Sequence, residues 1–276
     1  MLLAGEGSDS LIWAVSSVVD LRRAPQHTSE LITQAIMGET MTRLESIGDW
    51  YFVRMEDDYH GWVRSWSVAE AARSDIEDHF ERANARVEVN VGYLLSTVEP
   101  NSIPVTDLVS GTRVEILSSE GKYSYIRAPG GKAGYFPSDS LGPVKKEETC
   151  RADIVERAGK FLGIPYVWGG TSAKGFDCSG LVKRVYMMEG IDLPRDADQQ
   201  TSAGEPISLE KIDTARPADL LFFADGDKIT HVGIALGGGR FIHSYGDVRI
   251  NSYMEEDPLY EEKLAKKLVF GRSIIP

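Results

Sequence analysis

The sequence predicts an α+β fold in which two small all-β modules precede one mixed helix-and-strand domain. Three observations lead to this prediction: an ungapped repeat in the first half, a polar stretch led by Pro143, and helical patterns followed by strand patterns in the second half. With 276 residues, 42% of them apolar, the chain is long enough for about two globular domains.

A repeat with an offset of 73 residues runs through the first half of the chain. In each copy a β-rich run is followed by a polar, turn-prone stretch and then by a glycine, an aromatic residue and an apolar residue. The β-rich runs are residues 50–54 and 123–127, and the later triplets are residues 61–63 and 134–136. We therefore expect two antiparallel modules of one kind.

The segment between the two copies predicts a connecting helix at residues 68–85, because apolar residues recur there at helical spacing among charged ones. The first module then covers residues 1–67 and the second covers residues 86–144. The last domain covers residues 145–276, after the polar stretch.

The last domain has a different pattern. Apolar spacing around Ile154 predicts a helix that ends near Gly163, and a glycine-rich loop and a second helix at about residues 179–188 follow. Strands are expected at residues 220–223, 232–236 and 240–243, and the glycines at 237–239 suit a hairpin turn.

Composition excludes several classes of partner. The 42 acidic and 30 basic residues give a formal charge of −12, so we expect neither nucleic acid nor a membrane as a partner. Two cysteines are too few for a disulfide framework, and Cys150 is expected to be an inert thiol at a helix end. The start of the sequence lacks a secretory pattern, so we expect a cytoplasmic monomer; a periplasmic or envelope location is the alternative if a leader has been removed.

Cys178 follows a turn and precedes an apolar helical run. A thiol at a helix N-terminus faces unpaired N–H groups and the positive end of the helix dipole, so we expect a lowered pKa and a nucleophilic thiolate. Taken alone, the same residue also suits a buried, inert position.

Two histidines, His231 and His243, are 12 residues apart and lie beside β-rich apolar runs. Two adjacent antiparallel strands would bring such residues together, so that one serves as the base and the other orients it. Each histidine alone equally suits an ordinary hydrogen-bonded position.

At this point the sequence resembles the NlpC-type cysteine peptidases, papain-like enzymes that cut bacterial cell-wall peptides. The resemblance covers roughly residues 149–276. The matching stretches are Pro165-Tyr-Val-Trp-Gly-Gly-Thr, Phe176-Asp-Cys-Ser-Gly-Leu-Val, Leu193-Pro-Arg-Asp, Pro217-Ala-Asp-Leu-Leu-Phe-Phe, His231-Val-Gly-Ile and Phe241-Ile-His-Ser.

The resemblance implies roles for six of these residues. Cys178 becomes the nucleophile, His231 the general base and His243 the residue that orients it, while Tyr166 lies near the oxyanion. The neighbours of the nucleophile, Asp177 and Ser179, are expected to hold the amide and the free α-carboxylate of the substrate; Asp177 or Ser179 also suits the helix N-cap.

The sequence departs from the family pattern at two positions. Ala218 stands where glycine often follows Pro217, and Ala197 stands where many relatives have serine. The second departure removes one hydroxyl contact to the substrate, and catalysis should survive both.

The β modules resemble bacterial SH3-like domains through residues 18–25 and 29–34, and two of them before an NlpC-type domain resemble the γ-D-glutamyl-L-diamino acid endopeptidases that recycle wall peptides. This implies that Glu30 and Tyr59 hold the free amine of the peptide L-Ala-γ-D-Glu-diamino acid. Trp168 and Trp62 are expected to line the cleft, although each also suits a structural core. Glu30 and Tyr59 also suit ordinary surface positions.

No metal-ligand spacing and no phosphate-binding loop is present, so we expect no cofactor. Two alternatives remain open: an endopeptidase that acts on intact peptidoglycan, and a catalytically silent wall-binding protein. The sequence does not decide between diaminopimelate and lysine on the leaving side.

Overall fold

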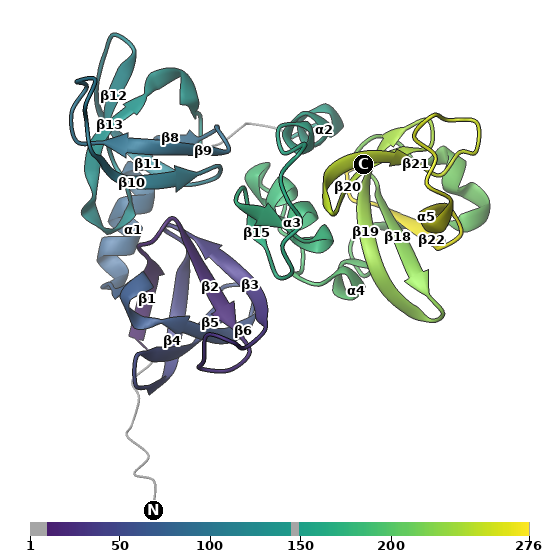
Figure 1. Cartoon of the computed structure of the whole chain (residues 1–276), viewed down its shortest axis with the longest axis horizontal. Coiled ribbons are helices and arrows are strands. Elements are labelled where there is room, and N and C mark those ends of the chain that lie inside the picture. The colour runs from purple at the N-terminus through teal and green to yellow at the C-terminus, as the bar shows by residue number, and fades with distance from the viewer. Residues whose placement is uncertain (1–9, 145–148, 276) are drawn as a thin grey trace, which may run out of the picture. The chain divides into compact units, whose positions relative to one another are not determined.

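The computed structural model describes residues 10–144 and 149–275 and divides the chain into two compact units, Met1–Val144 and Lys145–Pro276 (Figure 1). The first unit holds two curled antiparallel sheets of seven strands each, and the second holds one six-stranded sheet with helices. This is the predicted α+β fold with two β modules ahead of the mixed domain. Each unit is described here by itself.

The first β module has the strand order β3-β2-β6-β5-β4-β1-β7. Its elements are β1 (Ser10–Ala14), β2 (Val18–Arg22), β3 (Leu31–Ile36), β4 (Thr40–Ile47), β5 (Trp50–Met55), β6 (His60–Arg64), the 3-10 helix η1 (Ser65–Ser67) and β7 (Val68–Glu70). Alternate strand residues point into one apolar core, which includes Ile12, Leu21 and Val53.

The second module repeats this order as β10-β9-β13-β12-β11-β8-β14. Its elements are β8 (Ala85–Val87), β9 (Val91–Leu95), β10 (Pro104–Val109), β11 (Arg113–Glu120), β12 (Tyr123–Arg127), η2 (Pro129–Gly131), β13 (Ala133–Pro137), η3 (Ser138–Ser140) and β14 (Leu141–Gly142). Leu94, Ile126 and Phe136 belong to its separate core.

The strand pairing confirms the sequence repeat. Pairs in the second module lie 73 residues after their counterparts in the first: Phe52 with Trp62 and Val53 with Gly61, against Tyr125 with Tyr135 and Ile126 with Gly134. A β-bulge also recurs, between Arg43 and Glu45 and again between Ile116 and Ser118. Both copies therefore fold in one register, bulge included.

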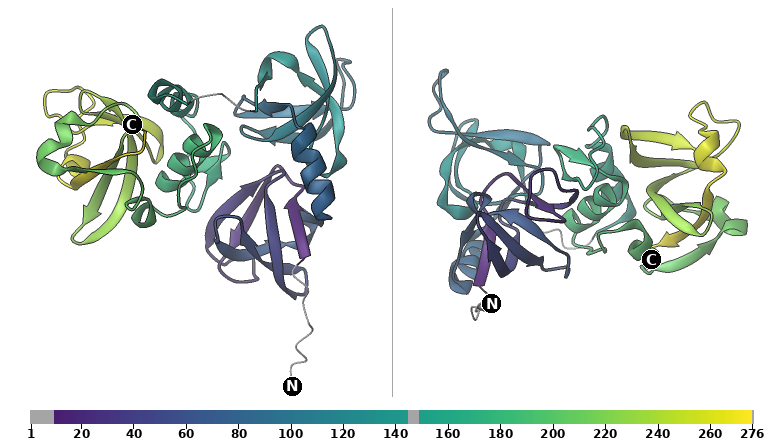
Figure 2. Two further views of the ribbon diagram at one scale, coloured as in Figure 1. Left: turned by 180° about the vertical axis from the view of Figure 1, so that it is seen from behind. Right: turned by 60° about the horizontal axis from the view of Figure 1, so that its bottom comes forward.

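The predicted connecting helix at residues 68–85 is wrong at both ends. The helix α1 spans Arg73–Arg82, as Figure 2 shows between the two modules. Residues on either side extend the sheets instead, because β7 pairs with β1 and β8 pairs with β11. Val68 and Ala85 are buried in these sheets, so sheet burial outweighs helical spacing at these positions.

The second unit is built on a six-stranded sheet with the order β17-β22-β18-β19-β20-β21. The strands of this sheet are β17 (Glu205–Ser208), β18 (Leu220–Asp225), β19 (Lys228–Gly237), β20 (Arg240–Tyr245), β21 (Asp247–Ser252) and β22 (Leu268–Ser273), and a separate two-stranded sheet consists of β15 (Thr171–Ser172) and β16 (Gly175–Phe176). Its helices are α2 (Arg151–Gly159), α3 (Cys178–Met188), α4 (Ala197–Gln200), η4 (Leu209–Thr214) and α5 (Glu262–Ala265). The three predicted strands and both predicted helices are present, although α2 ends four residues before Gly163.

The central strand β18 separates two apolar clusters. Leu220 and Phe222 join the cluster formed with α2 and α3, whereas Leu221 and Phe223 join a second cluster with η4 and α5. Since successive side chains of a strand point to opposite faces, a continuous apolar run marks a strand buried on both sides. This fixes α3 against β19 and β20, where the candidate residues lie.

The part of the chain that the structure describes lacks two features, a membrane-spanning helix and a cluster of metal-binding side chains. Within residues 10–144 and 149–275, no helix is long and apolar enough to cross a membrane. Over the same ranges, no three histidine, cysteine or acidic side chains gather in a way that could hold a metal ion.

Candidate active site

Cys178 is the first residue of α3, and its position depends on two close approaches. The carboxylate of Asp177 caps the helix by accepting a hydrogen bond from the amide of Gly180 at 2.7 Å. A Cβ atom at Gly180 would lie 2.1 Å from the carbonyl oxygen of Gly170, so this position requires glycine. The start of α3 thereby packs directly on the glycine-rich loop, and Cys178 is only 9% exposed.

The relay beside Cys178 comes from three neighbouring strands. Nε2 of His231, on β19, lies 2.7 Å from Nδ1 of His243, on β20. Nε2 of His243 in turn lies 3.0 Å from Oδ1 of Asn251, on β21. The backbone N–H of Val232, the residue after His231, donates a hydrogen bond to the thiol of Cys178.

Hydrogen-bond satisfaction assigns the protons along this relay. The amide nitrogen of Asn251 donates to the carbonyl of Leu259 at 3.2 Å, which leaves Oδ1 as the acceptor that faces His243. His243 therefore donates from Nε2 and accepts at Nδ1, and His231 donates from Nε2. Nδ1 of His231 is then the ring nitrogen that carries a free lone pair, as a general base requires.

The pKa values of the two histidines favour their neutral forms. Burial lowers the pKa of His231 to about 3, and the neighbouring His243 lowers it further. Burial likewise lowers the pKa of His243 to about 4, against the opposing effect of its hydrogen bond to Asn251. At neutral pH both rings are uncharged, because a buried imidazolium would lack its hydration.

The expected lowering of the Cys178 pKa is wrong for the resting chain. Burial raises the pKa of the thiol to about 11, and the negative charge of Asp177 adds to the rise. The N–H groups of Val232 and Ser179 lower it by less. A position at a helix N-terminus thus fails to offset desolvation here, so the resting pair is a neutral thiol and a neutral imidazole.

Tyr166 is half-buried beside this pair. Burial raises the pKa of its phenol above the ordinary value, and the nearby Cys178 and Asp177 raise it further. Its backbone amide is held by the carbonyl of Gly246 at 2.9 Å. The phenol therefore stays protonated and can donate a hydrogen bond to a developing oxyanion.

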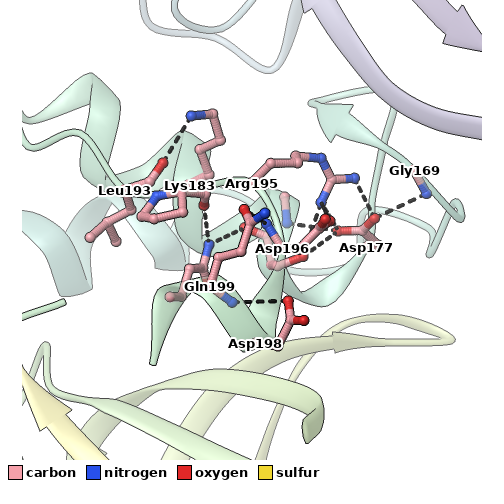
Figure 3. A network of polar contacts seen from close by, with 12 residues as sticks. Gly169, Asp177, Lys183, Leu193, Arg195, Asp196, Asp198 and Gln199 are labelled. Carbon is pink, nitrogen blue, oxygen red and sulfur yellow. Dashed lines mark hydrogen bonds and ion pairs between the residues drawn. The ribbon is translucent and has the colours of Figure 1, made fainter. Parts of the chain in front are cut away.

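A buried charged cluster surrounds Asp177, the residue before Cys178, as Figure 3 shows. Arg195, 2% exposed, binds the Asp177 carboxylate through both terminal nitrogens, at 3.1 and 2.5 Å, and also donates to the hydroxyl of Ser179 at 2.9 Å. Asp177 accepts a further bond from the amide of Gly169 at 3.0 Å. Both predicted substrate contacts, Asp177 and Ser179, are thus joined to Arg195, and Asp177 is the N-cap.

The first module holds the two residues expected to bind an amine. Glu30 precedes β3 and Tyr59 precedes β6, and both strands pair with the same end of β2, at Arg22. Glu30 is exposed and forms an ion pair with Arg23 at 2.6 Å. The two residues therefore lie at one edge of this module, with Glu30 already partnered by a cation.

The two tryptophans differ in exposure. Trp168 is 63% exposed in the glycine-rich loop of the second unit, so the core alternative is wrong for it. Trp62 is buried within the first module, and the centroid of its ring lies 5.2 Å from that of Phe52. Cys150 is an exposed free thiol at the N-cap of α2, and Cys178 is the buried one.

Sequence reasoning missed two residues of the site. Arg195 was seen within the matching stretch but without a partner, and Asn251 carried no signal because a polar residue on an outer strand is common. The signal that could have identified Arg195 is the N-cap carboxylate of Asp177. A carboxylate that is buried needs a cation beside it, and Arg195 supplies that cation.

Comparison with known proteins gives two matching family models. Residues 163–269 match the NlpC/P60 family, and residues 21–68 match the bacterial dipeptidyl-peptidase SH3 domain. The C-terminal unit of this chain belongs to the NlpC/P60 family. The chain is a cysteine peptidase. The resemblance stated from the sequence is thereby confirmed for the family.

Several known proteins are similar to this one over most of the chain. A γ-D-glutamyl-L-lysine dipeptidyl-peptidase of Bacillus subtilis is 29% identical over 232 residues, or 77% of this chain and 71% of the relative. Dipeptidyl-peptidase 6 of Lysinibacillus sphaericus is 27% identical over 91% of this chain and 94% of the relative. A crystal structure of an NlpC/P60 family protein from Bacillus cereus has a TM-score of 0.81 at 22% identity, covering 97% of this chain and all of that chain, and so shares its fold.

Proposed function

We propose that this peptidase hydrolyses the bond between the γ-carboxyl of D-glutamate and the α-amine of an L-diamino acid in cell-wall peptides with a free N-terminal L-Ala. The observation that carries the proposal is the relay of His231, His243 and Asn251 beside the thiol of Cys178. It is supported by relatives that are named γ-D-glutamyl-L-lysine dipeptidyl-peptidases. Release of wall peptides for recycling follows from this specificity.

In the acylation step, Nδ1 of His231 takes the proton from the Cys178 thiol while sulfur attacks the γ-carbonyl carbon. Because the resting pair is neutral, proton transfer and attack occur together and not from a preformed thiolate. Tyr166 and the backbone N–H of Cys178 stabilise the oxyanion. His231 then gives its proton to the departing amine of the diamino acid.

Deacylation reverses the proton flow. His231 takes a proton from water, the hydroxide adds to the thioester, and the C–S bond breaks as the proton returns to sulfur. His243 keeps the His231 ring oriented throughout by accepting from its Nε2, and Asn251 fixes His243 in turn.

On the acyl side, Ser179 and Arg195 are suited to the α-carboxylate of D-glutamate. A carboxylate brought into a buried place needs a cation nearby, and Arg195 lies next to the Ser179 hydroxyl. Asp177 holds this arginine and the loop at Gly169. Glu30 and Tyr59 are proposed to bind the free amine of L-Ala, and Trp168 to form an apolar wall.

The test uses L-Ala-γ-D-Glu-diaminopimelate and its N-acetylated form, with products identified by mass spectrometry and Cys178→Ala as the blank. Release of L-Ala-γ-D-Glu from the free peptide alone is expected. Cleavage of both peptides would replace the recycling role with that of a wall endopeptidase, and cleavage of neither would refute the proposal.

The amine contact is tested by Glu30→Gln, with Glu45→Gln as the matched control because Glu45 is an exposed strand residue of the same module. We expect Glu30→Gln to raise KM for the free peptide and to reduce its preference over the acetylated one. Equal behaviour of the two variants would remove Glu30 from the binding site.

A further inference from the structure

A cavity of about 700 Å³ opens beside His231 within the second unit. It is lined by the aromatic rings of Tyr166 and Tyr245 and by charged side chains from the β18–β19 turn and around α5. The charged residues are Asp225, Glu261, Lys263, Lys266 and Lys267. Its lining does not include Asp177, Ser179 or Arg195, which form the separate charged cluster described above.

The chemistry decides which part of the substrate faces this cavity. His231 must hand a proton to the leaving amine, so the residue that carries this amine lies against the His231 ring. The acyl side is already occupied by the Asp177 cluster. The cavity beside His231 is therefore the place for the leaving residue.

We propose that this cavity binds the leaving diamino acid and that Lys263 recognises a carboxylate on it. The inference rests on the proposed function and adds the leaving-side subsite to it. Lys263 then acts in specificity and takes no part in proton transfer.

The ion pairs around the cavity single out Lys263. Lys267 pairs with Asp225 at 3.1 Å, and Lys266 pairs with Glu262 at 2.5 Å. Among the residues that the structure describes, Lys263 forms no ion pair, and it is exposed at the cavity wall. In a chain with a formal charge of −12, this places an available cation in the wall of the cavity that His231 also lines.

The leaving residue offers two carboxylates. The α-carboxylate is free when the diamino acid ends the peptide, and diaminopimelate carries a second one at the end of its side chain, where lysine has only an ammonium group. Lys263 suits either, so the chemical class is a carboxylate, and substrates that differ in these groups separate the two sources.

The experiment measures kcat/KM on four peptides with the same L-Ala-γ-D-Glu part. They end in L-lysine, L-lysine α-amide, meso-diaminopimelate or meso-diaminopimelate amidated at the α-carboxylate. The full chain is compared with Lys263→Gln, Lys263→Glu and the control Lys211→Gln, since Lys211 is exposed in the same unit and lies outside the cavity lining.

We expect Lys263→Gln to lower kcat/KM about three- to fivefold on peptides that carry the recognised carboxylate, as for an exposed ion pair, with a larger loss for Lys263→Glu. The effect should vanish on lysine α-amide and shrink with added salt. A loss on amidated diaminopimelate assigns the side-chain carboxylate, and a loss only on peptides with a free α-carboxylate assigns that group.

Equal rates for Lys263→Gln and Lys211→Gln on all four peptides would overturn the subsite while leaving the proposed function intact. Failure of the unsubstituted protein to cleave any of the four would instead overturn the proposed function. Folding is checked by thermal unfolding, and both lysine positions are exposed, so neither substitution should change it by much.

Discussion

Two buried polar networks meet at Cys178, and they differ in charge. The network of Asp177, Ser179 and Arg195 is ionic, and it joins the start of α3 to Arg195 and to the glycine-rich loop at Gly169. The network of His231, His243 and Asn251 is neutral and ends at a ring nitrogen with a free lone pair. The comparison teaches that a buried charge needs a partner of opposite charge for each of its polar groups. A proton relay instead works because one ring nitrogen keeps a lone pair without a hydrogen-bond donor.

The largest expected effect breaks the neutral network. His231→Gln keeps a polar side chain of similar size but removes the base, so kcat/KM should fall by about 10²- to 10⁴-fold. Steady-state kinetics on the free peptide checks this, with the unfolding curve at pH 7 as the control for folding. A loss below tenfold would mean that another group serves as the base.

The ionic network should respond in stability. Arg195→Met leaves the Asp177 carboxylate buried without its cation, which costs about 3–5 kcal/mol of unfolding free energy. The double variant Arg195→Met with Asp177→Asn removes the stranded charge and should recover part of that loss. Urea unfolding measures both, and a double variant less stable than Arg195→Met would contradict the charge argument.

Acidification should destabilise the chain through the neutral network, because its two histidines are buried without charge. His231 has a pKa of about 3 in the folded chain against 6.5 for an ordinary histidine, so below pH 6.5 the unfolded chain binds more protons and stability falls. Between pH 6.5 and pH 5 this costs about 2 kcal/mol at His231, and His243 adds to it. The loss fades out over about one pH unit above 6.5, as the histidine of the unfolded chain also becomes neutral.

The measurement is the free energy of unfolding in urea at pH 5 and pH 7, for the unsubstituted chain and for His231→Gln. The variant should lose less stability on acidification, by about 2 kcal/mol. An identical loss in both proteins would show that His231 titrates normally.

The smallest effect concerns Asn251. Asn251→Leu removes the acceptor that fixes the His243 ring, and loss of one such hydrogen bond is worth about 1 kcal/mol, or about fivefold in kcat. Asn251→Asp restores an acceptor with a negative charge, which raises the pKa of His243 and should move the acidic limb of the kcat profile to higher pH. A flat response of both rate and pH profile would confine Asn251 to a structural role.

Several features of the fold were predictable because they depend on local pattern. The β-rich runs recur at a fixed offset, and their pairing register follows the same offset, because alternation of side chains fixes which face each residue takes. The 12-residue spacing of the histidines works because β19 and β20 form a hairpin whose turn consists of glycines with positive φ. Gly233 also leaves room for the Cβ of His243, which lies 3.2 Å from where its own Cβ would be.

Other features were beyond reach of the sequence because they depend on what packs around a residue. Spacing over residues 68–85 suited a helix, but Val68 and Ala85 gain more from burial in sheets. Ala218 was expected to matter little, yet it adopts a φ of +69°, the left-handed region that explains why glycine suits this position.

The sequence by itself predicted the nucleophile and the two histidines, from residue types, spacing and the family resemblance. It also predicted the repeated module and the family, which the strand pairing and the comparisons confirm. Only the tertiary structure decided the direction of the Cys178 pKa, the partners of Arg195 and Asn251, and the cavity at Lys263. The physical reason is that ionisation and hydrogen-bond satisfaction depend on burial and on neighbours brought from distant segments, and spacing along the chain carries neither.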